Sequence, residues 1–288
     1  MTTDNPVVGL INPGAMGTPI GCAALASGAR VCWVSMDRSP ESTTRAQSSG
    51  FEGVATEDEL AARCELIISV CPPHAAVEVA RRIAALEFKG LYVDANAISP
   101  ETSRDIGALV ESGGARFVDG SIIGGPPVER GTTRLYLSGP AAAKAQQYFA
   151  KGLFDVVVVD DIIGSASALK MAYAAWTKGS DALLLNIRAL AVARGVEAAL
   201  LAEWRQSMPG LAERSQAAVE GSVPKAWRFI GEMQQIADTL AATNLPDGFH
   251  RGAEAVYDRL SGYKNQTDLD MTEVLTALAR PSTGQTGH

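Results

Sequence analysis

The chain has 288 residues, a formal net charge of −7 at pH 7, 47% hydrophobic residues and 20% charged residues. This balance is typical of a globular protein with a sizeable core, and the length suits one large domain or two of ordinary size. The negative charge, without a run of five or six like charges, argues against a nucleic-acid partner. Cys22, Cys32, Cys64 and Cys71 form no C-x-x-C pair, so we expect buried, reduced thiols and no metal site.

The first residues, MTTDNPVVGLI, lack the basic segment and long apolar run of a signal peptide. No apolar stretch reaches the roughly 18 residues that a membrane-spanning helix needs. We therefore expect a cytoplasmic protein without a membrane partner. The last residues, RPSTGQTGH, are polar and are expected to be frayed.

Apolar runs typical of β-strands alternate with helical patterns in the first part of the chain. The predicted strands are residues 7–11, 30–36, 66–70, 91–94, 116–119, 134–138 and 155–159. Such alternation is typical of βαβ units, and apolar runs without polar alternation are typical of strands covered on both faces. The fold class that this predicts is α/β, with a doubly wound, Rossmann-type parallel sheet in residues 1–160.

Strand patterns stop after about residue 160. Residues 161–195 contain no proline and predict one helix of roughly 30 residues, about 45 Å long. Further helical segments are predicted at residues 196–208, 223–243, 249–260 and 269–279, with Pro and Gly at the breaks between them. Residues 161–288 are therefore predicted to form an all-helical domain built on one long helix.

The segment VVGLINPGAMGTPIG, residues 7–21, combines a predicted strand, a turn and a helix start. Dinucleotide-binding turns have the spacing G-x-G-x-x-G, which falls here on Asn12, Gly14 and Gly17. Gly14 lets the backbone approach a pyrophosphate, and Gly17 lets the helix pack close to the strand. Asparagine adopts left-handed backbone at modest cost, so we expect Asn12 to tolerate the turn. An ordinary βα turn is the alternative.

The second predicted strand leads to Asp37-Arg38-Ser39, about 20 residues beyond Gly17, where a dinucleotide-binding unit reads the adenosine ribose. A carboxylate there accepts hydrogen bonds from a ribose 2′-hydroxyl and favours NAD. An arginine followed by a hydroxyl favours the 2′-phosphate of NADP. We favour NADP, with NAD and a solvated charged turn as the alternatives.

Several motifs, taken in chain order, resemble those of the β-hydroxyacid dehydrogenases, which include 6-phosphogluconate and 3-hydroxyisobutyrate dehydrogenases. The motifs are GLINPGAMG, MDRSPES, ISVCPP, YVDANAISPETS, FVDGSIIGGPP and GSASALKMAYA, and they cover roughly residues 6–190. The helical remainder is similar to a less characterised, phosphogluconate-dehydrogenase-like branch. The resemblance implies hydride transfer between a nicotinamide cofactor and an alcohol/carbonyl substrate. By the same analogy, the helical domain is expected to form a homodimer in which the partner's helices complete each substrate cleft.

The motif GSASALKMAYA carries Lys170 at the position of the family's catalytic lysine. A lysine can accept the hydroxyl proton only when partly unprotonated, and its ordinary pKa of about 10.4 is too high for that. Lys170 lies in an apolar run, so we expect burial to lower its pKa and Lys170 to act as the general acid/base. A lysine that extends from the helix to solvent is the alternative.

Two departures from the family motifs bear on the substrate. Ala174 stands where the family has an asparagine, four residues after the lysine, and Ile123 stands where it has the serine of S-G-G. Both changes remove hydrogen-bonding groups that a buried carboxylate needs. We therefore predict a substrate that is not a small hydroxy acid but is bulkier, more apolar, or held by other residues.

The predicted site falls into three groups. The cofactor residues are Asn12, Gly14, Ala15, Met16, Asp37, Arg38, Val70, Cys71 and Asn96. The substrate residues are Ser121, Ile123, Gly124, Gly125, Tyr173 and Ala174, with Trp176, Lys178, Trp227, Arg228 and Glu232 as weaker candidates. Lys170 is the catalytic residue. The alternatives to a dehydrogenase are an imine-reducing relative, which commonly lacks this lysine, and a non-catalytic nucleotide-binding module.

Overall fold

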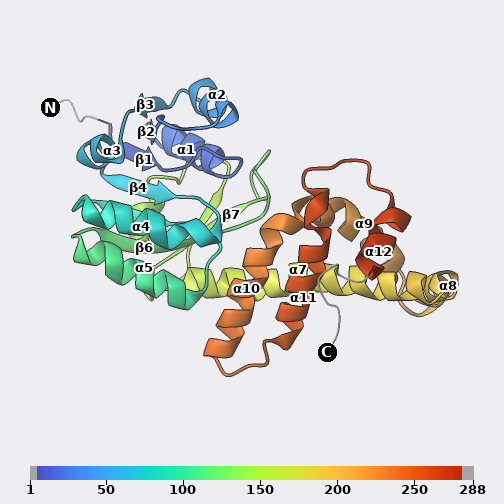
Figure 1. Cartoon of the computed structure of the whole chain (residues 1–288). Coiled ribbons are helices and arrows are strands. Elements are labelled where there is room, and N and C mark those ends of the chain that lie inside the picture. Colours follow the sequence, from blue (N-terminus) through green and yellow to red (C-terminus); the bar gives the residue numbers. More distant parts are fainter. Residues whose placement is uncertain (1–4, 281–288) are drawn as a thin grey trace. The chain divides into compact units, whose positions relative to one another are not determined.

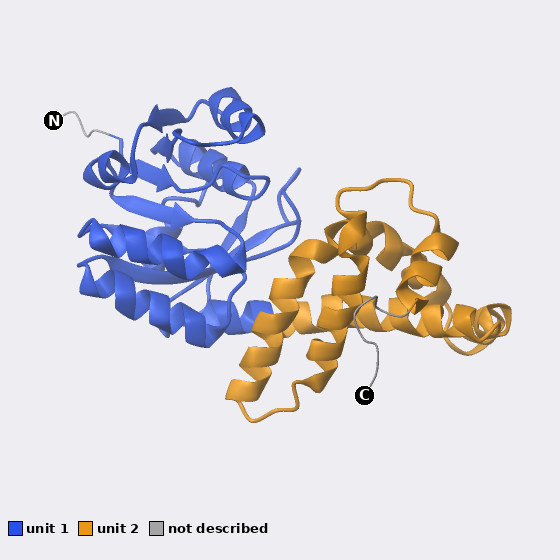
Figure 2. Ribbon diagram, viewed as in Figure 1, with its two compact units in different colours: residues 1–171 blue, residues 172–288 orange. Residues whose placement is uncertain are grey.

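The computed structural model describes residues 5–280 and divides the chain into two compact units, residues 1–171 and 172–288 (Figures 1 and 2). The first unit is an α/β domain and the second is helical, so the predicted fold class is confirmed. The division between the units, after Met171, lies inside the long helix α7 (Ser165–Ala193) and is eleven residues beyond the predicted change at residue 160. The division of roles between cofactor and substrate domains stays a prediction.

The first unit is built on an eight-stranded sheet with the order β3-β2-β1-β4-β5-β6-β7-β8. Its strands are β1 (Val7–Leu10), β2 (Arg30–Val34), β3 (Glu52–Val54), β4 (Leu66–Ser69), β5 (Leu91–Asp94), β6 (Arg116–Ile123), β7 (Arg134–Ser138) and β8 (Asp155–Val158). Strands β1 to β6 are parallel, and β7 runs antiparallel to β6. The carboxyl ends of the first six strands therefore lie at one edge of the sheet, where open α/β sheets bind ligands.

Helices cover both faces of the sheet (Figure 1). The helices of this unit are α1 (Gly17–Ala26), α2 (Pro40–Ser48), α3 (Glu57–Arg63), α4 (Ala76–Ala85), α5 (Pro100–Ser112) and α6 (Ala142–Gln146). Side chains of α1, α2 and α6 pack in one apolar core, and those of α3, α4 and α5 pack in a second. The fully buried strand β4, with the sequence LIIS, lies between β1 and β5 and has no polar face, as a strand covered on both faces requires.

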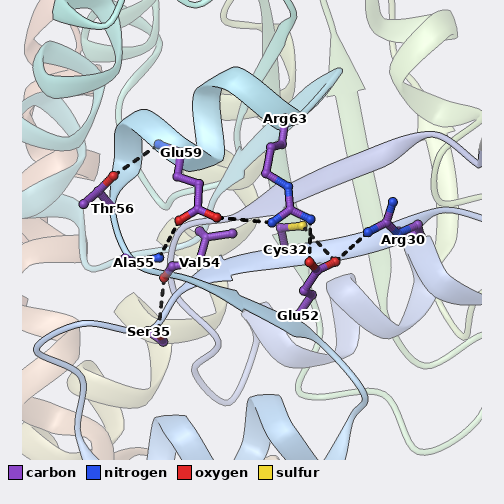
Figure 3. Close-up of polar contacts among 9 residues, drawn as sticks. All are labelled: Arg30, Cys32, Ser35, Glu52, Val54, Ala55, Thr56, Glu59 and Arg63. Atoms are coloured by element: carbon purple, nitrogen blue, oxygen red, sulfur yellow. Dashed lines mark hydrogen bonds and ion pairs between the residues drawn. The ribbon is translucent and has the colours of Figure 1, made fainter.

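A polar network holds β2, β3 and α3 together (Figure 3). Arg30 and Arg63 both donate to Glu52, at 2.7 and 2.5 Å, and Arg63 also donates to Glu59 at 3.4 Å. The thiol of Cys32 lies 3.9 Å from the Glu52 carboxylate. A hydrogen bond with Cys64 lowers the pKa of Cys32, while the same contact and burial raise the pKa of Cys64. The network anchors strand β2, which leads to Asp37 and Arg38.

The remaining helices are those of the second unit, which also contains the later part of α7. They are α8 (Glu197–Ser207), α9 (Leu211–Ser222), α10 (Ala226–Ala242), α11 (Gly248–Leu260) and α12 (Met271–Ala279). The buried Arg188 of α7 donates to Ser215 of α9 at 2.6 Å and to Glu197 of α8 at 2.5 Å. Tyr257 of α11 is fully buried and donates to the Lys178 carbonyl oxygen at 2.7 Å, which ties α11 to α7.

Two elements and one set of side chains differ from the sequence-based expectations. Strand β3 was not predicted, because three residues that include a glycine give no apolar run. Helix α9 was not predicted either, because its sequence LAERSQAAVEGS has a weak apolar pattern. Burial of all four cysteines was wrong: Cys32 and Cys64 are buried, but Cys22 is exposed and Cys71 is half-buried.

Candidate cofactor and catalytic site

The turn between β1 and α1 has the geometry of a phosphate-binding turn. A Cβ atom at Gly17 would lie 2.0 Å from the Asn12 carbonyl oxygen, so only glycine allows this approach of helix to turn. A Cβ at Gly14 would meet no atom within 4 Å, so the backbone there faces open space. The cap residue Met16 supplies no side-chain hydrogen bond to the N-terminus of α1. The turn therefore offers an open approach to an uncapped helix N-terminus.

Asn12 does not have the backbone that its sequence position suggested. Among the described non-glycine residues, positive φ angles occur at Asp37, Glu87, Asn244, Asn265 and Asp268, and Asn12 is not one of them. The expectation that Asn12 adopts left-handed backbone is therefore wrong. The Asn12 side chain instead accepts a 2.9 Å hydrogen bond from Arg38 Nη1.

After β2, the side chains of Asp37 and Arg38 have different surroundings. Asp37 has a φ of 57°, a left-handed conformation that aspartate tolerates better than most side chains, and it is exposed. Arg38 turns back over the opening turn: Nε donates to the Val34 carbonyl oxygen at 3.2 Å, in addition to the contact with Asn12. Arg45 of α2 also reaches the turn, because its Nε donates to the Pro13 carbonyl oxygen at 3.2 Å.

The residues predicted near the nicotinamide end lie where β4 and β5 end. Val70 packs against the core, and the Cys71 amide donates to Asn96 Oδ1 at 2.5 Å. The Asn96 amide nitrogen donates to Asp94 at 2.9 Å and to Ser69 at 3.3 Å. The structure thus brings Cys71 and Asn96 into contact, and the Asn96 side chain is engaged by protein groups on both sides.

Burial dominates the electrostatics of this cluster. Asp94 is fully buried, and desolvation raises its pKa from the ordinary 3.8 to about 7, although hydrogen bonds from Asn96 oppose the shift. Burial also raises the pKa of the Cys71 thiol to about 11. The thiol of Cys71 is therefore held in its neutral form at ordinary pH.

Strand β6 and the loop that follows it carry the predicted substrate residues of the first unit. The buried Ser121 hydroxyl donates to the Ala166 carbonyl oxygen at 2.7 Å, and Ile123 is only 3% exposed. Gly124 has a φ of 118°, and a Cβ there would lie 2.6 Å from the Thr132 carbonyl oxygen. A Cβ at Gly125 would meet no atom within 4 Å, so the loop is open at that residue.

Asp119 fixes the start of helix α7. One of its carboxylate oxygens accepts from the Gly164 amide at 3.1 Å, the Ser167 amide at 2.9 Å and the Ser138 hydroxyl at 2.9 Å. The other accepts from the hydroxyls of Ser103 at 2.8 Å and Ser167 at 2.6 Å. All of these groups are buried, so Asp119 ties α5, β7 and the first turn of α7 to strand β6.

Lys170 lies one turn beyond this anchor and points back to strand β6. Its Nζ donates to the Ile122 carbonyl oxygen at 2.9 Å, and its side chain is half-buried. The ammonium thus lies at the end of β6, beside Ile123 and the glycine loop. The alternative of a lysine that extends fully into solvent does not agree with this contact.

The predicted substrate residues of the second unit differ in burial and in their contacts. Ala174 is fully buried, whereas Tyr173 is 46% exposed and Trp176 is 68% exposed. Lys178 and Glu232 form a buried ion pair, so each neutralises the other within the unit. Their role as substrate-binding groups is correspondingly weakened.

Trp227, another weaker candidate, has two cations near its ring. Lys264 Nζ lies 4.0 Å from the ring centroid, and the Arg228 guanidinium carbon lies 6.0 Å from it.

A mostly parallel sheet with a glycine turn after its first strand and an arginine after its second is typical of a Rossmann-type, dinucleotide-binding domain. Residues 7–152 match the NAD binding domain of 6-phosphogluconate dehydrogenase, and residues 191–260 match a domain family of unknown function. The chain belongs to the β-hydroxyacid dehydrogenase superfamily, as the sequence motifs indicated. Its fold is that of NAD(P)-dependent dehydrogenases and reductases.

Individual relatives agree with this family. An uncharacterised 28.5 kDa protein of Methanothermus fervidus is 30% identical over 154 residues, which are 54% of this chain and 59% of that protein. The chain thus matches just under three fifths of the length of this curated relative. A conserved protein of unknown function, described as structurally similar to 3-hydroxyacid dehydrogenases, is 27% identical with a TM-score of 0.66 and covers 89% of this chain and 97% of its own.

The structure of 3-hydroxyisobutyrate dehydrogenase from Salmonella typhimurium has a TM-score of 0.70 at 18% identity, covering 94% of this chain and 99% of its own. At this identity the likeness shows the fold alone. None of the helices within residues 5–280 combines the length and the apolar character needed to cross a bilayer.

Sequence reasoning missed three residues that shape this region. Asp94 and Asp119 were part of quoted motifs, but only the sheet register, which pairs them on adjacent strands, shows that both are buried. Arg45 lies 32 residues from Pro13 in the sequence, so its contact with the turn could not be read from local spacing. A carboxylate that ends an apolar run and is followed by small residues is the signal that could have indicated the first two.

Proposed function

We propose that the protein is an NADP-dependent dehydrogenase or reductase that acts on an alcohol/carbonyl pair, with Lys170 as general acid/base. The observation that carries the proposal is the 2.9 Å contact between Lys170 Nζ and the Ile122 carbonyl oxygen, on a helix whose start is held by Asp119. This contact supports a lysine held at a defined place at the carboxyl edge of the sheet.

The residues of the first unit fit a nicotinamide dinucleotide. The open backbone at Gly14 and the uncapped N-terminus of α1, reached past Ala15 and Met16, suit a pyrophosphate. Arg38 suits the adenosine 2′-phosphate, because a guanidinium binds phosphate through two parallel N–H groups. Exposed Asp37 is the group that a ribose 2′-hydroxyl of NAD would use, so the choice of NADP depends on Arg38.

The Asn96 amide is engaged by protein groups, so we propose that it orients the Cys71 segment beside the cofactor and does not itself bind the nicotinamide ribose.

When bound, the nicotinamide supplies or accepts the hydride. Lys170 handles the proton: its neutral amine has a lone pair that can take the substrate's hydroxyl proton, and its ammonium can return a proton to a carbonyl oxygen. The Ile122 carbonyl oxygen accepts a hydrogen bond from the amine in both protonation states, so Nζ keeps its position as the proton moves. A lowered pKa of Lys170, caused by burial and by the charge of an oxidised nicotinamide, stays a prediction.

The groups beside Lys170 favour a substrate without a small, buried carboxylate. Ile123 offers no donor, and the single proton of the Ser121 hydroxyl is used by the Ala166 carbonyl oxygen. Ala174, four residues after Lys170, is fully buried and offers no donor either. We therefore propose a bulkier or more apolar alcohol or ketone as substrate, since a carboxylate buried without partners costs several kcal/mol.

The test is a cofactor-reduction screen over diols, small hydroxy acids and apolar alcohols, with NAD and NADP in separate series, for the wild type and Lys170→Met. We expect turnover of an apolar alcohol with NADP, a loss of at least about 100-fold in kcat in Lys170→Met, and unchanged NADPH binding by fluorescence. The wild-type pH profile should show an ionisation that Lys170→Met lacks. Turnover chiefly of small hydroxy acids would contradict the substrate proposal, and full activity of Lys170→Met would contradict the role of the lysine.

The same screen separates the alternatives. Reduction of cyclic imines with NADPH, unaffected by Lys170→Met, would favour an imine reductase. Cofactor binding without turnover of any substrate would favour a non-catalytic module. A cytoplasmic location is part of the proposal, and it is supported by the four free cysteines.

A further inference from the structure

Asn12 stands where the opening turn usually has a glycine. Tolerance of left-handed backbone does not explain why an asparagine occupies this position. Its φ is not positive, so the turn does not need a glycine-like backbone there. Its side chain is half-buried and directed to Arg38, with a distance of 2.9 Å between Oδ1 and Nη1. The contact joins residues 26 positions apart, and a glycine at this position could not make it.

Arg38 is held at two points by neutral acceptors. Nη1 donates to the Asn12 side chain, and Nε donates to the Val34 carbonyl oxygen at 3.2 Å. A guanidinium has five N–H groups in a fixed plane, so two fixed donors define the orientation of the other three. Among the described residues these are the hydrogen bonds of the Arg38 guanidinium, which leaves one N–H of Nη1 and both N–H groups of Nη2 for a ligand.

A second arginine borders the same turn. Arg45 Nε donates to the Pro13 carbonyl oxygen at 3.2 Å, and its Nη2 donates to the Ser42 hydroxyl at 3.3 Å. Two cations from the segment after β2 therefore hold adjacent residues of the turn, Arg38 through the Asn12 side chain and Arg45 through the Pro13 backbone. Only the first of these contacts depends on which side chain occupies position 12.

We infer that Asn12 is a specificity-determining residue: its amide oxygen positions the Arg38 guanidinium for the adenosine 2′-phosphate and so sets the preference for NADP over NAD. The inference rests on the proposed NADP-dependent function. The neutrality of the amide matters as much as its geometry. An aspartate would hold Arg38 equally well but neutralise its charge, whereas a glycine would leave the charge but release the side chain.

Both substitutions lower phosphate affinity, for different reasons. With glycine, Arg38 is no longer held in place, so more conformational entropy is lost when phosphate binds. With aspartate, an ion pair to Arg38 competes with the phosphate.

The experiment is calorimetric titration of the protein with adenosine 2′,5′-bisphosphate and with 5′-AMP, which differ only in the 2′-phosphate. Wild type should bind the bisphosphate more tightly. Asn12→Gly should bind the bisphosphate about tenfold more weakly, the effect of one oriented hydrogen bond to a charged group, with 5′-AMP unchanged. Asn12→Asp should lose more than Asn12→Gly, and the loss should be specific to the bisphosphate.

A double-mutant cycle separates positioning from a general change in the turn. In an Arg38→Ala background, Asn12→Gly should have no further effect on bisphosphate affinity, because the group it positions is gone. In an Arg45→Ala background, Asn12→Gly should keep its full tenfold effect, because Arg45 holds the turn through Pro13 and not through Asn12. Arg45→Ala is thus the matched control for loss of an arginine contact to this turn.

The outcomes separate the inference from the function on which it rests. A wild type that binds bisphosphate and 5′-AMP equally contradicts the NADP proposal. A wild type that prefers the bisphosphate, combined with Asn12→Gly that keeps this preference or weakens both ligands equally, overturns the role of Asn12 and leaves the NADP proposal intact. Equal effects of Asn12→Gly with and without Arg38 also overturn it.

Discussion

Asn96 and the buried Asp94 form a hydrogen-bonded pair, in which the carboxylate of Asp94 accepts from both amide groups of Asn96. The Asn96 backbone amide donates to one oxygen of Asp94 at 3.0 Å, and the side-chain amide donates to the other at 2.9 Å. These bonds stabilise the ionised carboxylate, but burial outweighs them and raises the pKa of Asp94 to about 7. The sequence placed Asn96 at the end of a strand correctly, yet its contacts with Ser69 and Cys71 could not be predicted, because these residues lie at the end of the neighbouring strand β4.

The raised pKa of Asp94 predicts how stability depends on pH. Between about pH 4 and pH 7 the folded protein holds the Asp94 proton and the unfolded chain does not, so Asp94 lowers the free energy of unfolding as pH rises through this window. The slope from this group is up to about 1.4 kcal/mol per pH unit, and above pH 7 its effect is constant.

Asp94→Asn should therefore remove this slope. Urea unfolding of wild type and Asp94→Asn at pH 5, 6, 7 and 8 measures it, with Asp105→Asn, an exposed carboxylate on α5, as the control. The same pH slope in Asp94→Asn and wild type would contradict the expected shift.

At the scale of elements, the start of α7 shows how one buried carboxylate positions a helix. Helix N-termini leave backbone N–H groups without partners, and Asp119 accepts two of them, from Gly164 and Ser167. The Ala166 amide next to them donates to the Ser138 hydroxyl at 3.0 Å. Because Lys170 lies in the next turn, the position of its side chain at β6 depends on this anchor.

Asp119→Asn should loosen the start of α7 and impair catalysis more than cofactor binding. The amide keeps one acceptor oxygen and turns a donor toward groups that need acceptors, so we expect a loss of about 2–4 kcal/mol in the free energy of unfolding. Turnover should fall by at least about tenfold, since a small displacement of a catalytic group is costly, while NADPH affinity should stay within about twofold. Chemical denaturation, steady-state kinetics and NADPH fluorescence measure the three quantities.

Asp160→Asn is the matched control: it makes the same change at an exposed carboxylate, where the remaining amide oxygen can still accept the 2.9 Å hydrogen bond from the Ile162 amide. Asp119→Asn with wild-type kcat would show that Lys170 does not depend on the anchor.

Sequence patterns predicted the bounds of a strand well where a short apolar run lies between two polar breaks. Strand β5, with the sequence LYVD, and strand β7 were predicted with their observed bounds, because each is a short apolar run between polar breaks. Strand β6 continues four residues beyond its predicted end at Asp119, because the following residues pair with β7. Pairing between distant segments is a tertiary effect, which local patterns do not contain.

At the scale of the whole molecule, the order of an α/β unit followed by helices was predictable because the apolar period changes once, near residue 160. The shape of the turn after β1 was also predictable, because the spacing of Gly14 and Gly17 is a local signal. The contacts of Ser121 and Lys178 were not, because their partners Ala166 and Glu232 lie 45 and 54 residues away in the sequence. That these residues bind cofactor or substrate stays a prediction.

The second unit leaves an apolar stripe on α7 that predicts self-association. Trp176, Leu183 and Leu190 are 68%, 43% and 59% exposed, and their spacing of seven residues places them along one side of the helix. Apolar side chains repeated every seven residues along one side of a helix are typical of packing against another helix. We expect a second copy of this chain to cover the stripe in a homodimer.

Leu183→Glu combined with Leu190→Glu should convert the dimer to a monomer, because two carboxylates buried in an apolar interface cost several kcal/mol, a large part of the binding energy of a micromolar to nanomolar dimer. Light scattering coupled to size-exclusion chromatography over a concentration series measures the mass. Leu245→Glu, at an equally exposed leucine outside the stripe, is the matched control and should remain dimeric. If the wild type is a monomer at high micromolar concentration, or if the double variant and the control dimerise equally, the stripe is not the interface.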